Sequence, residues 1–256
     1  GILLGQMVKV IEDYDIKSLG HNSPQTIQLL VEAERRAYAD RSHFMGDPDY
    51  MNLPVYELMD KEYVLDRMKN FSWDKATLSS EVKHGNIIVQ ESDETTHYSI
   101  IDKYGNSISV TTTLNNSYGS KVFVEEGGFF LNNEMDDFSS KPGHPNFYGL
   151  IGSKANSIQP GKRMLSSMTP SIVLKDNKPS LIVGTPGGST IITSVLQTIL
   201  NVYEFDMSVQ EAVNAPRFHH QWLPDVVIFE EGILDKEKDS ILKSKNYFVI
   251  SLPIEV

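Results

Sequence analysis

The spacing of apolar residues changes near position 95, and this change constrains the 256-residue chain more strongly than any other feature. Over about the first ninety residues, apolar side chains recur every three or four positions, as they do along one face of a helix. From position 96 onward, runs of β-branched and aromatic residues are separated by turn residues, a pattern typical of hairpins. The chain is therefore expected to begin with helices and to continue as strands followed by further helices.

The clearest helix start lies at Ser23 and Pro24. Ser23 can accept a hydrogen bond from a backbone N–H of the first turn, and proline suits that turn because its missing N–H is not needed there. We expect Glu32, Arg35 and Arg36 to form the solvated face of this helix. The other predicted elements are helices over 2–11, 55–68, 191–200 and 241–245, a short helix beginning at 208, and strands over 96–101, 107–114, 122–124, 129–131, 171–174, 181–183 and 247–252.

Charge and composition exclude several kinds of site. The chain has 23 Lys and Arg against 34 Asp and Glu, a net charge of −11, and it lacks the basic stripe that binding to nucleic acid or an anionic membrane requires. It contains no cysteine, which excludes disulfides, thiolate zinc sites and a cysteine nucleophile. No apolar run reaches the roughly 20 residues that span a bilayer.

The first candidate for chemistry is Thr95, at the start of the first predicted strand. Threonine and its neighbours there are also ordinary residues of a half-exposed strand, and this structural explanation stays open. The functional hypothesis is an N-terminal nucleophile. Cutting the preceding peptide bond would free the α-amino group of Thr95, which could then act as the base for its own hydroxyl.

Two further groups of polar residues follow. Thr113 and Asn115 lie two positions apart on a predicted strand, so we expect them on one face, with Thr113 supporting the nucleophile and Asn115 holding substrate. Glu134 and Asp137 border a long loop that could close over a pocket, where carboxylates would suit an ammonium group. Both sets of residues are also compatible with ordinary solvent-facing positions on a strand or a turn.

Three more motifs carry groups that could belong to a site. Ser166 and Ser167 lie between apolar residues, which indicates partial burial, and a substrate carboxylate could satisfy their hydroxyls. Gly187 and Gly188 precede a predicted helix, where exposed backbone N–H groups could stabilise an oxyanion. The pair His219-His220 has no further ligand at helical spacing, so no metal site and no cofactor are expected.

Taken together, these motifs resemble those of the γ-glutamyltransferases. The segments that carry the resemblance are TTHYS at 95–99, LNNEMDDF at 131–138, LSSMTP at 165–170, PGGS at 186–189, NAPRFHHQWLP at 214–224, and YADR and GDP at 38–41 and 46–48. They occur in the order found in that family and cover nearly the whole chain.

The resemblance implies an α+β fold, the αββα sandwich of N-terminal-nucleophile (Ntn) hydrolases, which this chain would contain incompletely. It also implies a precursor that cleaves itself between Glu94 and Thr95. Residues 1–94 would then be the C-terminal part of the large subunit, and residues 95–256 a small catalytic subunit truncated at its C-terminus. We expect the remainder of the large subunit, with an arginine that pairs with the substrate carboxylate, to lie outside this chain.

The family also implies the role of each residue. Thr95 would attack the γ-carbonyl of glutathione or another γ-glutamyl compound, with Thr113 supporting it. Water, an amino acid or a dipeptide would then accept the γ-glutamyl group. The remaining matches are Gly187 and Gly188 for the oxyanion hole, Asn115, Glu134 and Asp137 for the substrate α-amino group, Ser166 and Ser167 for its α-carboxylate, and Tyr148 for a lid over the site.

Two alternatives remain beside this hypothesis. One is another amidase on the same scaffold, such as a cephalosporin acylase or a poly-γ-glutamate depolymerase. The other is a homologue that is neither processed nor catalytic. By family resemblance the protein is expected in the periplasm or secreted, and the resemblance leaves open whether this chain alone is cleaved or active.

Overall fold

The computed structural model describes residues 1–82 and 95–252. The helices are α1 (Ile2–Ile11), α2 (Ile16–Leu19), α3 (Pro24–Phe44), α4 (Val55–Leu58), α5 (Lys61–Met68), α6 (Ile191–Tyr203), α7 (Val209–Asn214) and α8 (Lys236–Ser244), with 3-10 turns η1 (Glu134–Asp137), η2 (Lys154–Asn156) and η3 (Gly188–Thr190). The strands are β1 (Thr95–Ile101), β2 (Ser107–Thr113), β3 (Phe123–Val124), β4 (Phe129–Phe130), β5 (Ser171–Lys175), β6 (Lys178–Val183), β7 (Phe218–His219), β8 (Val227–Phe229) and β9 (Val249–Ser251).

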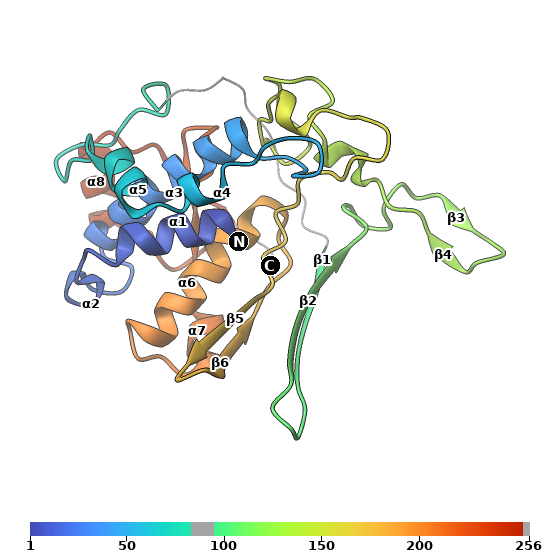
Figure 1. Ribbon diagram of the computed structural model, residues 1–256. Helices are drawn as coiled ribbons and strands as arrows, with labels where there is room; N and C mark the ends of the chain where they lie inside the picture. The colour runs from blue at the N-terminus through green and yellow to red at the C-terminus, as the bar shows by residue number, and fades with distance from the viewer. Residues whose placement is uncertain (83–94, 253–256) are drawn as a thin grey trace.

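The described residues are arranged in layers. Helices α1, α3, α5 and α6 gather on one side, the β5–β6 hairpin lies beneath them, and the β1–β2 hairpin stands beyond it (Figure 1). The apolar side chains of Leu181 and Val183 on β6 pack against Ile191 and Val195 on α6. Within the part of the chain that the structure describes, no helix covers the outer side of β1–β2 (Figure 1).

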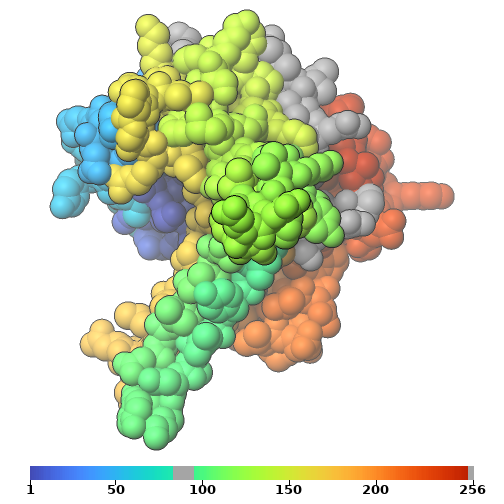
Figure 2. All heavy atoms as spheres, turned by 90° about the vertical axis from the view of Figure 1, so that its right-hand side faces the viewer, coloured from blue at the N-terminus to red at the C-terminus, as the bar shows by residue number. Residues whose placement is uncertain are grey.

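Side chains join the two hairpins. The hydroxyl of Ser99 on β1 donates to the carbonyl of Ile182 (3.2 Å), and that of Ser109 on β2 donates to the carbonyl of Val183 (3.2 Å). Figure 2 shows the β1–β2 hairpin extending away from the bulk of the molecule, which leaves Ile100 half exposed. These contacts fix the middle of the β1–β2 hairpin against β6, four residues along the strand from Thr95.

The expectation that Glu32, Arg35 and Arg36 face solvent is wrong. All three are buried, because helix α3 is covered on every side by other elements. The Glu32 carboxylate accepts a hydrogen bond from Arg36 Nη1 (2.5 Å) and another from the backbone N–H of Thr77 (3.0 Å). The Glu32 charge, which would be costly to bury alone, is thus neutralised within the helix by Arg36 and hydrogen-bonded by a distant segment at Thr77.

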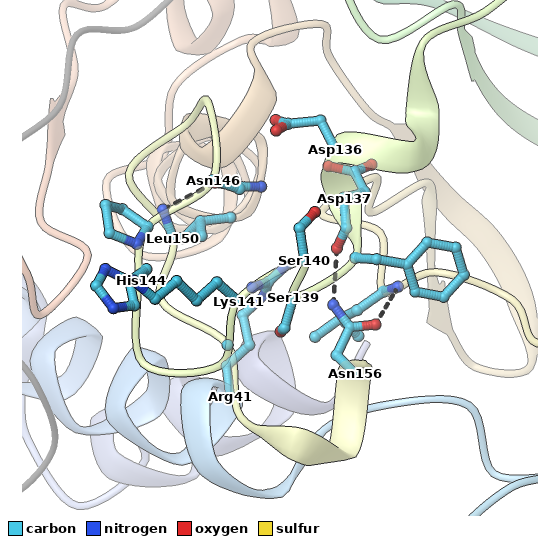
Figure 3. Close-up of a pocket in the computed structure, with 14 residues that line it drawn as sticks. Arg41, Asp136, Asp137, Ser139, Ser140, Lys141, His144, Asn146, Leu150 and Asn156 are labelled. Atoms are coloured by element: carbon cyan, nitrogen blue, oxygen red, sulfur yellow. Dashed lines mark hydrogen bonds between the residues drawn. The ribbon is translucent and has the colours of Figure 1, made fainter. Parts of the chain in front are cut away.

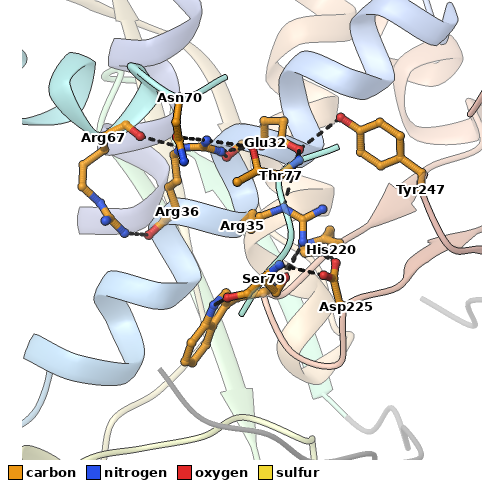
Figure 4. Close-up of polar contacts among 11 residues, drawn as sticks. Glu32, Arg35, Arg36, Arg67, Asn70, Thr77, Ser79, His220, Asp225 and Tyr247 are labelled. Carbon is orange, nitrogen blue, oxygen red and sulfur yellow. Dashed lines mark hydrogen bonds and ion pairs between the residues drawn. The ribbon is translucent and has the colours of Figure 1, made fainter. Parts of the chain in front are cut away.

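The buried network continues to the C-terminal part of the chain (Figure 4). Arg35 Nη1 donates to both the Ser79 hydroxyl and the Asp225 carboxylate. The Asp225 carboxylate also accepts the backbone N–H of Ser79 (2.7 Å), and the indole N–H of Trp222 donates to the Ser79 carbonyl (3.0 Å). Ser79 is therefore fixed by residues that lie on both sides of position 95 in the sequence.

Two predicted helices differ in extent from those observed. The helix predicted over 55–68 is interrupted, since the Asp60 carboxylate accepts the N–H of Tyr63 (2.9 Å) and caps a new helix, α5. Likewise α8 begins at Lys236 rather than at 241, because Asp235 caps it. None of the helices within residues 1–82 and 95–252 combines the length and apolar character needed to cross a bilayer.

Candidate active site

Thr95 occupies the first position of β1, directly opposite Thr113 in the antiparallel ladder. It is half-buried and lines an open cavity of about 260 Å³. The cavity walls are formed by residues of one region: Thr95, Thr96, Thr112, Thr113, Leu114, Asn116, Ser117 and Tyr118. The proposed cleavage partner, Glu94, lies outside the described residues. A substrate in this cavity would meet the hydroxyl-rich ends of both strands.

The two-residue spacing predicted that Asn115 shares a strand face with Thr113, and this prediction is wrong. Strand β2 ends at Thr113, and Asn115 adopts a positive φ of 77°, so the alternation of side chains stops before it. Its backbone N–H donates to Thr113 Oγ1 (2.9 Å), and its side-chain amide donates to the carbonyl of Asn133 (3.3 Å). Asn115 nevertheless remains adjacent to Thr113 and connects the strand end to the 131–138 segment.

Tyr148 is buried and links this strand end to the glycine turn. Its hydroxyl donates to the backbone carbonyl of Asn115 (2.7 Å), and its own carbonyl accepts the side-chain amide of Gln221 (3.0 Å). A Cβ added to Gly188 would lie 2.6 Å from the Tyr148 ring. A continuous series of contacts therefore runs from Thr95 through Thr113, Asn115 and Tyr148 to Gly188.

Gly187 and Gly188 form the turn that leads into α6. Both have positive φ values, 128° and 51°, which residues with a side chain rarely adopt. Among residues 1–82 and 95–252, neither N–H donates a hydrogen bond. Helix α3 fixes the turn, because the hydroxyl of Tyr38 donates to the carbonyl of Ser189 (2.6 Å). Two backbone donors at a helix N-terminus suit a developing negative charge.

Glu134 and Asp137 lie at the two ends of η1. Burial raises the pKa of Asp137 to about 7; the charges of Glu134 and Asp136 act in the same direction, and that of Arg41 opposes them. Burial also raises the pKa of Glu134. The charge of Arg41 does not offset the burial of Asp137, and a bound ammonium group would stabilise the charged forms of both acids.

Asp137 lines a second cavity, of about 110 Å³, together with Arg41, Ser139 and Asn156 (Figure 3). The carbonyl of Asp137 accepts the side-chain amide of Asn156 (2.7 Å), which fixes the end of η1. In Figure 3 the Arg41 side chain extends toward the cavity from α3, opposite Asp136 and Asp137. The acidic turn and helix α3 therefore face each other across this space.

The two serines are held differently. Ser166 Oγ accepts the backbone N–H of Met168 (3.1 Å), and Ser167 Oγ accepts a hydrogen bond from Arg41 Nη2 (3.1 Å). The second contact was not predicted, although Arg41 belongs to the YADR segment that carries part of the family resemblance. Helical periodicity gave no signal for it, because Arg41 and Ser167 lie 126 positions apart.

His219 and His220 are buried and structural in this arrangement. His219 Nδ1 lies 2.9 Å from the hydroxyl of Thr193 and its Nε2 lies 2.9 Å from Gln221 Oε1. Burial lowers the pKa of each histidine to about 4. No group of three or more His, Asp or Glu side chains able to hold a metal ion occurs among the described residues.

Comparisons with known proteins concern the family and the fold of this chain. Residues 1–251 match the sequence profile of the family described as Gamma-glutamyltranspeptidase. The chain is 49% identical over 232 residues to the glutathione hydrolase proenzyme of Escherichia coli K12, a match that covers 91% of this chain and 40% of that protein. The chain thus spans about two fifths of the length of this relative.

Solved structures give the same result. A mutant of the Helicobacter pylori γ-glutamyltranspeptidase superposes with a TM-score of 0.61 at 54% identity, covering 62% of this chain and 86% of the other. A cephalosporin acylase from Bacillus halodurans covers 98% of this chain and 42% of its own, with a TM-score of 0.79 at 20% identity, which establishes the fold alone. The predicted α+β Ntn-hydrolase fold is thereby confirmed, and the chain belongs to the γ-glutamyltranspeptidase family.

Proposed function

We propose that the complete protein, of which this chain is a part, is a γ-glutamyltransferase with glutathione hydrolase activity. The observation that carries the proposal is the position of Thr95, first in β1, opposite Thr113 and in the wall of an open cavity. Thr95 forms a γ-glutamyl ester with the donor and passes the group to water, an amino acid or a dipeptide.

The first step is self-cleavage of the precursor. The Thr95 hydroxyl attacks the carbonyl carbon of Glu94, and the peptide bond is replaced by an ester that water hydrolyses. The products are a carboxylate on Glu94 and a free α-amino group on Thr95. With an unperturbed pKa of about 7.7–8.0, a fraction of this amine is unprotonated near neutral pH and most of it above pH ~8, where it can act as a base.

Turnover uses the same hydroxyl. The Thr95 amine takes the hydroxyl proton as the oxygen attacks the γ-carbonyl, and the negative charge that forms on the carbonyl oxygen is stabilised by the N–H groups of Gly187 and Gly188. The amine then returns the proton to the leaving nitrogen, which releases cysteinylglycine when glutathione is the donor. Water or an acceptor amine attacks the ester by the reverse sequence and frees Thr95.

The donor is recognised through its amino acid head group. Asn115, Glu134 and Asp137 hold the α-ammonium, and Ser166 and Ser167 donate to the α-carboxylate. The raised pKa values of both acids support this assignment, since a cation bound beside them would stabilise their charged forms. Tyr148 covers the site. Its hydroxyl binds the carbonyl of Asn115 and its ring lies beside Gly188, so it fixes the distance between them.

The precursor would divide at position 95. Residues 1–94 form the end of the large subunit and residues 95–256 most of the small subunit, and the rest of the large subunit is the partner that completes the site. The buried network of Arg35, Ser79 and Asp225 supports a lasting association, because it joins the two products of the cut. A periplasmic or secreted location is proposed from the family.

The alternative of another amidase on the same scaffold is less favoured. The acidic pair on η1 and the serine pair at 166–167 fit a free α-amino acid head group, which the acyl side chain of a cephalosporin need not carry. The identity of 49% to a glutathione hydrolase proenzyme, against 34% to the acylase ACY 1 proenzyme of a Pseudomonas species, also favours γ-glutamyl donors.

The function is tested with the full-length protein and γ-glutamyl-p-nitroanilide as donor. Wild type should release p-nitroaniline, with a rate that rises as the Thr95 amine deprotonates around pH ~7–8. Thr95→Ala should abolish release, while Thr95→Ser, which keeps a hydroxyl, should retain part of it. Undiminished release by Thr95→Ala would refute the assignment, and hydrolysis of cephalosporins in preference to γ-glutamyl donors would favour the alternative.

A further inference from the structure

The inference concerns Arg41, a residue of α3 that no part of the mechanism above uses. Arg41 is 6% exposed, and within residues 1–82 and 95–252 it forms no ion pair within 4 Å, although the charge of Asp137 acts on it. Burying a guanidinium is costly, so its retention at this position needs a reason. The contacts of Arg41 lie at the proposed head-group site rather than within the helical core.

The hydrogen bond to Ser167 determines how that hydroxyl can act. Arg41 Nη2 donates to Ser167 Oγ (3.1 Å), and a guanidinium can only donate. One lone pair of the Ser167 oxygen is therefore occupied, and the hydroxyl proton points elsewhere. A serine fixed in this way is a ready donor toward a carboxylate, and the positive charge behind it polarises its O–H bond.

The cavity beside Arg41 is lined by charged groups of both signs, Asp136 and Asp137 as well as Lys141. Arg41 lines the cavity of about 110 Å³ that Asp137 also lines, and the Ser139 hydroxyl in that wall is buried with no hydrogen-bond partner among the described residues. Figure 3 places Arg41 and Asp137 on opposite sides of this space. The α-ammonium of a bound substrate would thus lie on the side of Asp137, and its α-carboxylate on the side of Arg41.

We propose that Arg41 is a positioning residue that acts through Ser167 and sets the specificity for donors bearing an α-carboxylate. The proposal rests on the proposed function. It also means that a residue upstream of position 95 orients a substrate contact downstream of it, so the two products of the cut form one binding site.

The test compares two donors on the full-length enzyme. γ-Glutamyl-p-nitroanilide carries the α-carboxylate, and 4-aminobutyryl-p-nitroanilide lacks it but keeps the amine and the scissile amide. The ratio of their kcat/KM values measures carboxylate recognition and does not depend on the fraction of active enzyme. We expect Arg41→Gln to reduce this ratio about tenfold, mainly through KM for the γ-glutamyl donor, and Arg41→Lys to reduce it about threefold.

Two controls separate positioning from a structural role. Arg36→Gln removes another buried arginine of α3, one paired with Glu32, and should lower stability without changing the ratio. Self-cleavage needs no head group, so its half-time should be unchanged in Arg41→Gln. In a Ser167→Ala background, Arg41→Gln should have little further effect on the ratio, because its route of action has been removed.

The outcomes are distinguishable. A ratio unchanged in both Arg41 variants, or lowered equally with and without Ser167, overturns the positioning role while leaving the proposed function intact. If Arg41→Gln fails to fold, Arg41→Lys decides by the same ratio. Absence of any turnover by self-cleaved wild type overturns the proposed function, and this proposal with it.

Discussion

Thr113 lies directly across the β1–β2 ladder from Thr95. Its hydroxyl oxygen accepts the backbone N–H of Asn115 (2.9 Å), so the residue opposite the proposed nucleophile is held by the residue that begins the head-group site. The ladder thereby couples the position of the nucleophile to that of the substrate, and a change at Thr113 should affect both.

Replacing Thr113 by valine keeps the shape of the side chain and removes its hydroxyl. We expect Thr113→Val to slow self-cleavage and to lower kcat by about 10–100-fold, since a hydrogen bond near a reacting group contributes roughly 1.5–3 kcal/mol when charge develops. Thr113→Ser retains the hydroxyl and should stay within a few-fold of wild type. Equal rates for the valine and serine variants would show that the hydroxyl has no role.

Gly188 is the position where a single methyl group should disrupt the site. A Cβ there would lie 2.6 Å from the Tyr148 ring, and φ is 51°. Gly188→Ala should therefore displace Tyr148 and raise the backbone energy, with a loss of about 1–2 kcal/mol in unfolding free energy and a larger loss in kcat. Steady-state kinetics and thermal denaturation measure the two effects.

Gly232 provides the matched control for that substitution. It also has a positive φ, 96°, but nothing lies within 4 Å of an added Cβ. Gly232→Ala should cost a similar strain energy and leave kcat unchanged. A kcat for Gly188→Ala equal to that for Gly232→Ala would contradict the assigned role of the glycine turn.

Asp137 should give the donor KM a pH dependence. Burial raises the pKa of Asp137 to about 7, so the carboxylate is increasingly protonated as pH falls below 7 and no longer attracts an ammonium. KM for γ-glutamyl-p-nitroanilide should rise over that range in wild type. In Asp137→Asn, KM should be raised at every pH and should vary little between pH 5.5 and 8.

The raised pKa of Asp137 also makes the stability of the fold depend on pH. Between pH ~4 and 7 the folded protein holds a proton on Asp137 that the unfolded chain has lost, so the free energy of unfolding falls as pH rises through this window. Asp137→Asn should therefore be more stable than wild type at pH 8, by on the order of 2 kcal/mol. Denaturant titrations at pH 5 and pH 8 test this, and a variant less stable than wild type at pH 8 would contradict it.

Asp225 should be important for stability rather than for chemistry. Burial raises the pKa of Asp225, but the hydrogen bond from His220 and the charge of Arg35 together hold this pKa below its ordinary value. Asp225→Asn leaves the buried Arg35 without its anion and should lower the free energy of unfolding by about 2 kcal/mol, because Asp225 is partly exposed. Asp239→Asn breaks a pair whose cation, Lys243, is exposed where Arg35 is buried, and should cost about 0.5 kcal/mol or less. Comparable losses in both variants would contradict the network.

Local signals in the sequence were sufficient for most elements. Ser23 caps α3 by accepting the N–H of Thr26 (3.1 Å), as predicted, and Ser208 and Glu211 form the expected capping box of α7. Such interactions lie within a few residues of each other, so the sequence displays both partners together. The family motifs, which are also local, were enough to identify the fold and the family.

Long-range burial was not predictable in the same way. The charges of Glu32, Arg35 and Arg36 indicated a solvated face, yet their partners Thr77 and Asp225 come from segments 45 and 190 positions away. The contact between Arg41 and Ser167 likewise depends on a tertiary approach that periodicity does not encode. The end of β2 at Thr113 also escaped the alternation argument, because a positive φ at Asn115 breaks the strand.

The central claim is that a single residue becomes both attacking group and proton acceptor when the chain is cut. The most direct measurement is N-terminal sequencing, with intact mass, of the full-length protein after expression. The account predicts two polypeptides, the smaller beginning Thr-Thr-His at Thr95, and one uncut polypeptide for Thr95→Ala. A single uncut chain that still turns over γ-glutamyl-p-nitroanilide would contradict it.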